Sequence, residues 1–69
     1  MRRWTDAENR ILAQNRHLSA AQLQRLLPGR SIGAIEAALG GVDQYLNGRD
    51  VSGLLSRRGI EILEEEFGR

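Results

Sequence analysis

The chain has 69 residues, no cysteine and a formal net charge of +1. A chain of this length forms one small domain that buries roughly 60% of its unfolded surface, so its hydrophobic core is thin. The absence of cysteine and of a clustered His/Asp/Glu set excludes disulfide bridges and a structural zinc site. No apolar run follows the basic start, which excludes a signal peptide and a membrane span, and we expect a soluble cytoplasmic protein.

The charge is unevenly distributed along the sequence. Residues 1–39 contain six arginines and three acidic residues, which gives +3, whereas residues 40–69 contain four arginines and six acidic residues, which gives −2. A mildly basic half is compatible with nucleic acid as a partner. It is far from the strongly basic balance that is typical of nucleic-acid-binding domains.

A first helix is predicted over residues 6–16. Thr5 and Glu8 are three residues apart, as in a capping box, where each side chain satisfies a backbone N–H at the helix start. Ile11 belongs to the buried stripe of this helix, and Trp4 can fold back onto that stripe from ahead of the cap.

Two further helices are predicted before the middle of the chain. Ser19 is a suitable N-cap, and the helix formers after it predict a second helix that ends at the Pro-Gly-Arg turn of residues 28–30. Ser31 then caps a third helix over residues 32–39, which the glycines at 40–41 are expected to end. So short a turn forces an angular crossing of the two helices, which is typical of helix-turn-helix units.

The stretch from Trp4 to Leu39 resembles the Myb/SANT-type tri-helical domain, including its stand-alone bacterial and phage members. The resemblance rests on the W-T-x-x-E opening and the L-P-G-R-S turn, and it covers a little over half of the chain. Family members carry three spaced bulky core residues, usually tryptophan. Trp4 matches the first of these, the second position falls near Ala20, and Leu39 occupies the third.

The resemblance implies a three-helix unit over residues 1–40, and residues 41–69 are then a helical extension that packs on this unit or forms a dimer contact. The expected fold class is all-α, with one or two helices after the first three. In this family the third helix enters the major groove of DNA, so the resemblance implies a small DNA-binding regulatory protein. The candidate nucleic-acid contacts are Arg2, Arg3, Arg25, Arg30, Ser31, Gly33, Glu36 and Ala37.

The third helix departs from the family, because the positions that usually carry base-contacting side chains supply no suitable donor. These positions are Gly33, Glu36 and Ala37. We therefore expect contacts mainly to phosphates, where Arg30 and the free N–H groups at the helix start would form an anion site. The alternatives are an ion pair between Arg30 and Glu8, and a plain helix cap for Ser31.

The composition of the third helix also supports a different function. Apolar or small residues surround nearly its whole circumference, so we expect burial on more than one side. A protein target or a second subunit would cover such a surface better than polar base edges. The alternative function is therefore a SANT-like protein-interaction module or small inhibitor. Its candidate contacts are Ile32, Ile35, Arg57, Arg58, Ile60, Leu63 and Phe67.

After the two glycines the sequence predicts two short segments. Residues 42–46 read as a helical turn that ends at the Asn-Gly pair of residues 47–48. Asp50 or Ser52 is then expected to cap another short helical piece that runs to Leu55.

The last predicted element is a helix over residues 57–67 with Ser56 as its cap, although the alternation over residues 60–62 would also suit a short strand. Arginines at residues 57–58 and glutamates at residues 64–66 oppose the helix dipole at both ends. An antiparallel pair of two copies would match these charges in a two-fold contact, which predicts a homodimer. The alternative is a solvated acidic face.

No catalytic constellation is visible in the sequence. His17 is the single histidine, and it has neither a cysteine nor a patterned serine as a partner. The glycines form no phosphate-binding loop. We therefore expect no enzymatic activity, no metal, no cofactor and no small-molecule substrate, and the expected partner is DNA or a protein.

Overall fold

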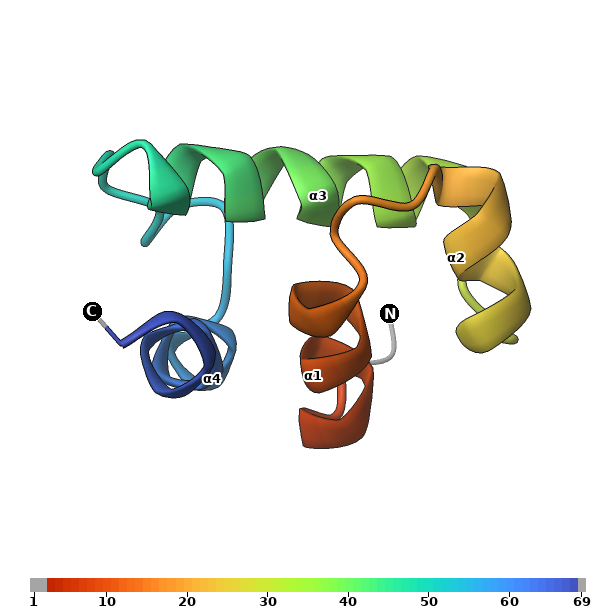
Figure 1. Cartoon of the computed structure of the whole chain (residues 1–69), viewed down its shortest axis with the longest axis horizontal. Helices are drawn as coiled ribbons and strands as arrows, with labels where there is room; N and C mark the ends of the chain where they lie inside the picture. The colour runs from red at the N-terminus through yellow and green to blue at the C-terminus, as the bar shows by residue number, and fades with distance from the viewer. Residues whose placement is uncertain (1–2, 69) are drawn as a thin grey trace.

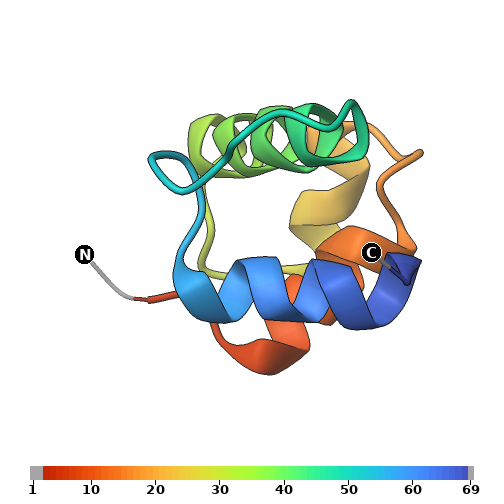
Figure 2. The ribbon, with the colours of Figure 1, turned by 90° about the vertical axis from the view of Figure 1, so that its left-hand side faces the viewer.

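The computed structural model describes residues 3–68, which contain four helices and no strand. The helices are α1 (Asp6–Gln14), α2 (Ala20–Leu26), α3 (Ile32–Leu46) and α4 (Arg57–Phe67). The predicted all-α class is therefore confirmed. α3 runs along one side of the molecule, and the other three helices lie on the same side of it (Figure 1). α1 packs mainly against α4, which is seen lengthwise in Figure 2, and α2 packs against α3.

Serine and threonine side chains cap the N-termini of the helices, as the sequence predicts. Thr5 Oγ1 accepts a hydrogen bond from the Glu8 N–H at 3.1 Å, and Glu8 Oε1 accepts one from the Thr5 N–H at 3.0 Å. Ser19 forms a second capping box at α2. Ser31 and Ser56 each accept from the N–H three residues further on. These local bonds satisfy backbone donors that the first turn of a helix leaves without a partner.

The hydrophobic core forms where the inner faces of all four helices meet. Its buried members are Leu12, Ala13, Leu23, Leu27, Ile35, Val42 and Leu63. Trp4 and Ile11 are half-buried and pack against this cluster. Trp4 therefore folds back onto the core from ahead of α1, as its place before the capping box predicts.

The prediction that the third helix ends at Gly40 is wrong, because α3 continues through both glycines to Leu46. A glycine within a helix costs about 1 kcal/mol relative to alanine. Val42 is fully buried in the core, and its burial favours continuation of the helix. The expected boundary between residues 40 and 41 thus falls inside one helix. α3 ends just before Gly48, whose φ of 79° is a conformation that glycine adopts most readily.

Gly41 allows the segment between α3 and α4 to pack closely against α3. A Cβ atom at Gly41 would lie 2.8 Å from Cδ2 of Leu55. Asp50 caps the segment that runs to Leu55, as one of the two expectations has it, since its Oδ1 accepts from the Ser52 N–H at 3.0 Å, but the segment is a single turn and not a helix. The carbonyl of Val51 then accepts two N–H groups and closes a single turn.

α4 confirms the predicted C-terminal helix, and the alternative of a strand is wrong. Ile62 and Leu63 are consecutive residues, and both are buried on the inner face of α4. In a strand they would point to opposite faces. Gly68 ends the helix with a φ of 75°, a left-handed conformation that suits glycine.

Arg58, Glu65 and Glu66, three of the α4 charges that oppose its dipole, have partners on α1. Arg58 Nη2 donates to Asp6 Oδ2 at 2.9 Å. At the other end Arg10 donates to Glu65 at 3.2 Å and to Glu66 at 3.3 Å. These partners come from the same chain, while Glu64 and Glu65 are exposed, and the pairing with a second copy stays a prediction. Because these pairs are largely exposed, each contributes little to stability, and buried side chains chiefly hold α1 on α4.

The two glycines of α3 should respond differently to alanine. A Cβ at Gly40 meets open space, so we expect Gly40→Ala to raise the free energy of unfolding by about 1 kcal/mol through helix propensity. Gly41→Ala should raise the free energy of unfolding by less, or lower it, because the Leu55 side chain must move. Urea denaturation of the two matched variants measures the difference. An equal increase in the free energy of unfolding for both variants would contradict the close contact between Gly41 and Leu55.

The ion pair between Asp6 and Arg58 predicts a pH dependence of stability. The hydrogen bond from Arg58 lowers the pKa of Asp6 below its ordinary value of 3.8. A group with such a lowered pKa stabilises the fold above its unfolded pKa, and this contribution is lost as the pH falls through the folded value. We expect Asp6→Asn to lower the melting temperature at neutral pH and to have no effect well below pH 3.8. Arg58→Gln should have the same effect. A difference in melting temperature from the wild type that does not change with pH would contradict a role for this ion pair.

Candidate functional site

Arg30 is the most constrained of the charged residues proposed from the sequence. Its side chain is only 7% exposed, and its Nη2 donates to Glu8 Oε1 at 2.7 Å. Nε donates to the other carboxylate oxygen at 3.0 Å, and Nη2 also donates to the carbonyl of Arg3 at 2.6 Å. The guanidinium carbon lies 4.6 Å from the centroid of the Trp4 ring, a cation–π distance. Arg30 therefore connects the N-terminal segment and α1 to the turn between α2 and α3.

Of the two expectations for Arg30, the structure contains the ion pair with Glu8 and not an exposed phosphate contact. The hydrogen bond to Glu8 raises the pKa of Arg30 further above its ordinary value, so the guanidinium stays charged. Ser31 likewise has the plainer role, since its Oγ accepts from the Ala34 N–H at 3.1 Å and caps α3. The expected anion site at the start of α3 is thus not formed by Arg30.

The outer face of α3 carries no basic side chain. Its exposed residues are Ile32, Gly33, Glu36, Ala37, Gly40 and Asp43. The three positions at which the family reads bases therefore do lie at the surface, as the resemblance implies, but one is acidic and two are small. A surface of this composition offers apolar contact and negative charge.

Ile35 was expected to contact a protein partner, and the structure contradicts this because its side chain is 0% exposed. Leu63 is also buried, as part of the core. Ile60 and Phe67 are half-buried, and Arg16 lies over the Phe67 ring at 5.9 Å. Most of the apolar face predicted on α4 is thus used inside the chain, which leaves little of it for a second copy.

The remaining arginines differ in how they are paired. Arg2 lies outside the described residues. Arg3, Arg25 and Arg57 are exposed, and their side chains make no hydrogen bond or ion pair with another described residue. Arg58 is exposed as well, but it binds Asp6 and Glu61. Among the described candidate residues, the unpaired cations therefore lie on the N-terminal segment, on α2 and at the start of α4.

A groove of about 1130 Å³ opens between the N-terminal segment, the first half of α3 and the start of α4, and we call it the α3–α4 groove. Its apolar lining consists of Trp4, Ala34, Ala37, Ala38, Leu54 and Leu55. Arg3, Arg57 and Arg58 line it too, together with Glu61. The groove brings together residues from three separate segments, of which the sequence singled out only some.

Asn9 also lines the α3–α4 groove and was not among the residues predicted from the sequence. It is 8% exposed, and its Nδ2 is buried without a hydrogen-bond partner. Gly59 lies close by, where a Cβ would be 3.6 Å from Asn9 Oδ1. Buried polar groups nearly always have a partner, so this exception needs an explanation. The available signal was a polar residue three positions before Leu12, on the buried stripe of α1.

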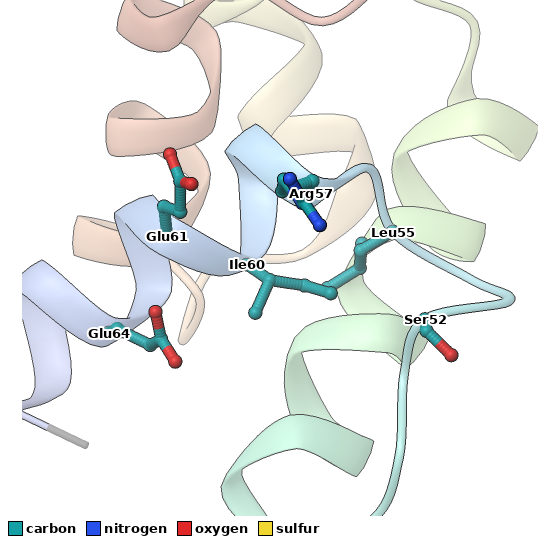
Figure 3. Close-up of a pocket in the computed structure, with 6 residues that line it drawn as sticks. All are labelled: Ser52, Leu55, Arg57, Ile60, Glu61 and Glu64. Carbon is teal, nitrogen blue, oxygen red and sulfur yellow. The ribbon is translucent and has the colours of Figure 1, made fainter.

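A smaller hollow of about 400 Å³ lies beside α4 and includes Arg57, which also lines the α3–α4 groove. Figure 3 shows Leu55 and Ile60 pointing toward one another there, with Glu61 and Glu64 along α4. This hollow is open to solvent and carries two carboxylates, so it is not an enclosed apolar site. Arg57 is thus the cation shared by both hollows.

The described residues hold no candidate metal site. They contain no group of three His, Cys, Asp or Glu residues placed to hold a metal ion. His17 is exposed in the connection between α1 and α2. None of the helices within residues 3–68 is long and apolar enough to cross a membrane.

No protein-family model matches this chain, and comparisons with curated proteins and with solved structures give no significant match. The resemblance to the Myb/SANT domain therefore stays a prediction from the residues that carry it.

Removal of the Arg30 side chain should cost far more stability than removal of an exposed arginine. We expect Arg30→Ala to lower the free energy of unfolding by about 3 kcal/mol, because it removes the cation that compensates the nearly buried Glu8 carboxylate. Arg25→Ala is the matched control and should change it by less than about 0.5 kcal/mol. Chemical denaturation measures both, and similar small effects would contradict a buried pair.

Proposed function

We propose that this chain is a protein-interaction module that binds its partner through the exposed surface of α3. The observation that carries the proposal is the composition of that surface. Ile32 is 41% exposed, Ala37 is exposed, and α3 contains neither arginine nor lysine. Release of water from apolar and small side chains favours contact with another protein.

The charges of α3 favour this function over DNA binding. Glu36 and Asp43 are both exposed, and their spacing of seven residues places them on one face of the helix. Carboxylates that approach phosphates are repelled, and base readout in the major groove depends largely on hydrogen-bond donors. Arg30, the cation expected beside this helix, is held by Glu8 within the chain.

DNA binding is the second candidate function, and one observation supports it. α2 and α3 are joined by a short turn, as in helix-turn-helix units, while Arg3 and Arg25 are exposed and unpaired among the described residues. Such arginines could bind phosphates, which positions a protein on DNA without specifying a sequence. This candidate therefore depends on backbone contacts and predicts a steep salt dependence.

A titration against random-sequence duplex DNA separates the two candidates. We expect no saturable binding at physiological salt, because the exposed face of α3 is acidic. Arg3→Ala and Arg25→Ala are the suitable variants, since Arg30→Ala would alter folding at the same time. Binding that weakens steeply with salt and is reduced by these two variants would establish the second candidate instead.

The positive test is affinity capture from the source cell with matched variants of α3. A partner retained by the wild-type chain should be lost when Ile32→Asp or Ala37→Glu introduces a charge on the exposed surface. Ala21→Glu, which places the same charge at an exposed position of α2, should retain it. Circular dichroism confirms that each variant is folded. A partner that all three variants retain would contradict binding through α3.

A further inference from the structure

The α3–α4 groove combines an exposed apolar lining with small residues. Leu54 is 55% exposed, the most of any large hydrophobic side chain among the described residues, and Ala37 faces the same groove. Ala34 and Ala38 provide low side chains on α3, which permit close approach of a second helix. α3 and α4 lie on opposite sides of this region, with the N-terminal segment near the start of α4 (Figure 2). A segment placed here would cover apolar surface that the chain leaves exposed.

A polar group without a partner lies in the same groove. Asn9 is more than nine-tenths buried, and its Nδ2 donates to no described residue. A buried donor without a partner is unfavourable for folding alone. A carbonyl or carboxylate of a bound segment would supply the missing acceptor. The groove thus has a feature that binding explains and folding does not.

The charges that line the groove determine which sign of charge its occupant should carry. Arg3 and Arg57 are exposed and make no side-chain bond with another described residue. Glu61 is the acidic residue of the lining, and it is engaged by Arg58, which Asp6 also binds. The two unpaired positive charges therefore favour an acidic segment and disfavour a basic one.

We propose that the α3–α4 groove binds an acidic amphipathic helix of a partner protein. The apolar side chains of that helix lie on Ala37 and Leu54, and its carboxylates face Arg3 and Arg57. A helix laid in a groove presents its apolar residues with the spacing of three and four that such a lining accepts. The inference rests on the proposed function and adds to it the site and the chemistry of the partner.

Trp4 makes the proposal directly measurable, because it is the only tryptophan of the chain and lines the groove. The probe is a synthetic helical peptide of about 15 residues, long enough to form a helix, with leucines at the i, i+3, i+4 and i+7 positions and glutamates elsewhere. One control peptide replaces every glutamate with lysine, and another replaces every leucine with serine. We expect saturable changes in Trp4 emission only with the first peptide, together with a shift of the Asn9 side-chain amide signal in NMR spectra.

Matched variants test the lining residues separately from the fold. Arg57→Ala should weaken the acidic peptide about tenfold through the loss of one charged contact. Arg49→Ala removes an exposed arginine outside the groove lining and should have no effect. Ala37→Glu should abolish binding, whereas Ala21→Glu, which alters a residue outside the lining, should preserve it. Thermal unfolding confirms that the variants are folded.

The remaining outcomes overturn the inference in distinguishable ways. If no acidic peptide binds while a cellular partner is lost in Ile32→Asp but retained in Ala37→Glu, the groove assignment is wrong and the proposed function stands. Equal binding of the lysine peptide contradicts an acidic partner. Self-association in sedimentation that Ala37→Glu abolishes makes a second copy the occupant. Salt-dependent DNA binding without any peptide or protein binding overturns this inference and the proposed function together.

Discussion

The buried guanidinium of Arg30 must be compensated inside the chain, and the groups that compensate it determine the arrangement of the N-terminal half. An uncompensated charge in a protein interior is strongly unfavourable. Glu8 binds it from α1, the carbonyl of Arg3 binds it from the N-terminal segment, and the Trp4 ring lies against it. One residue thus fixes three segments and places Trp4 where it forms a wall of the α3–α4 groove.

α3 has two roles along its length, and the glycines in its middle allow both. Ala34 and Ala37 of its first half line the groove. Further along, Gly41 admits Leu55 to close contact, and this contact holds the segment that carries Leu54 to the opposite wall. Both walls of the groove therefore depend on α3. The sequence reads these glycines as a helix stop, but one of them serves as a packing site.

The features predicted from sequence are those that depend on neighbouring residues. Thr5 and Ser56 identify helix starts because a cap and its N–H donor are three residues apart. The continuation of α3 depends on burial of Val42 against other helices, which no local pattern contains. The pairing of Arg58 with Asp6 joins residues 52 positions apart and was equally hidden. The groove has the same origin, since its lining comes from three segments.

A helix-turn-helix arrangement and a DNA-binding surface are separate properties, and charge distinguishes them in this chain. The capping residues and apolar spacing that carry the Myb/SANT resemblance concern how helices form and pack. Binding to phosphates requires cations that remain exposed, whereas Arg30 is buried in its ion pair with Glu8. The outer face of α3 is left with Glu36 and Asp43, while unpaired positive charge lies at the groove on Arg3 and Arg57. The outer face of α3 and the groove beside it therefore differ in charge, which favours an acidic segment in the groove over the same segment on the outer face.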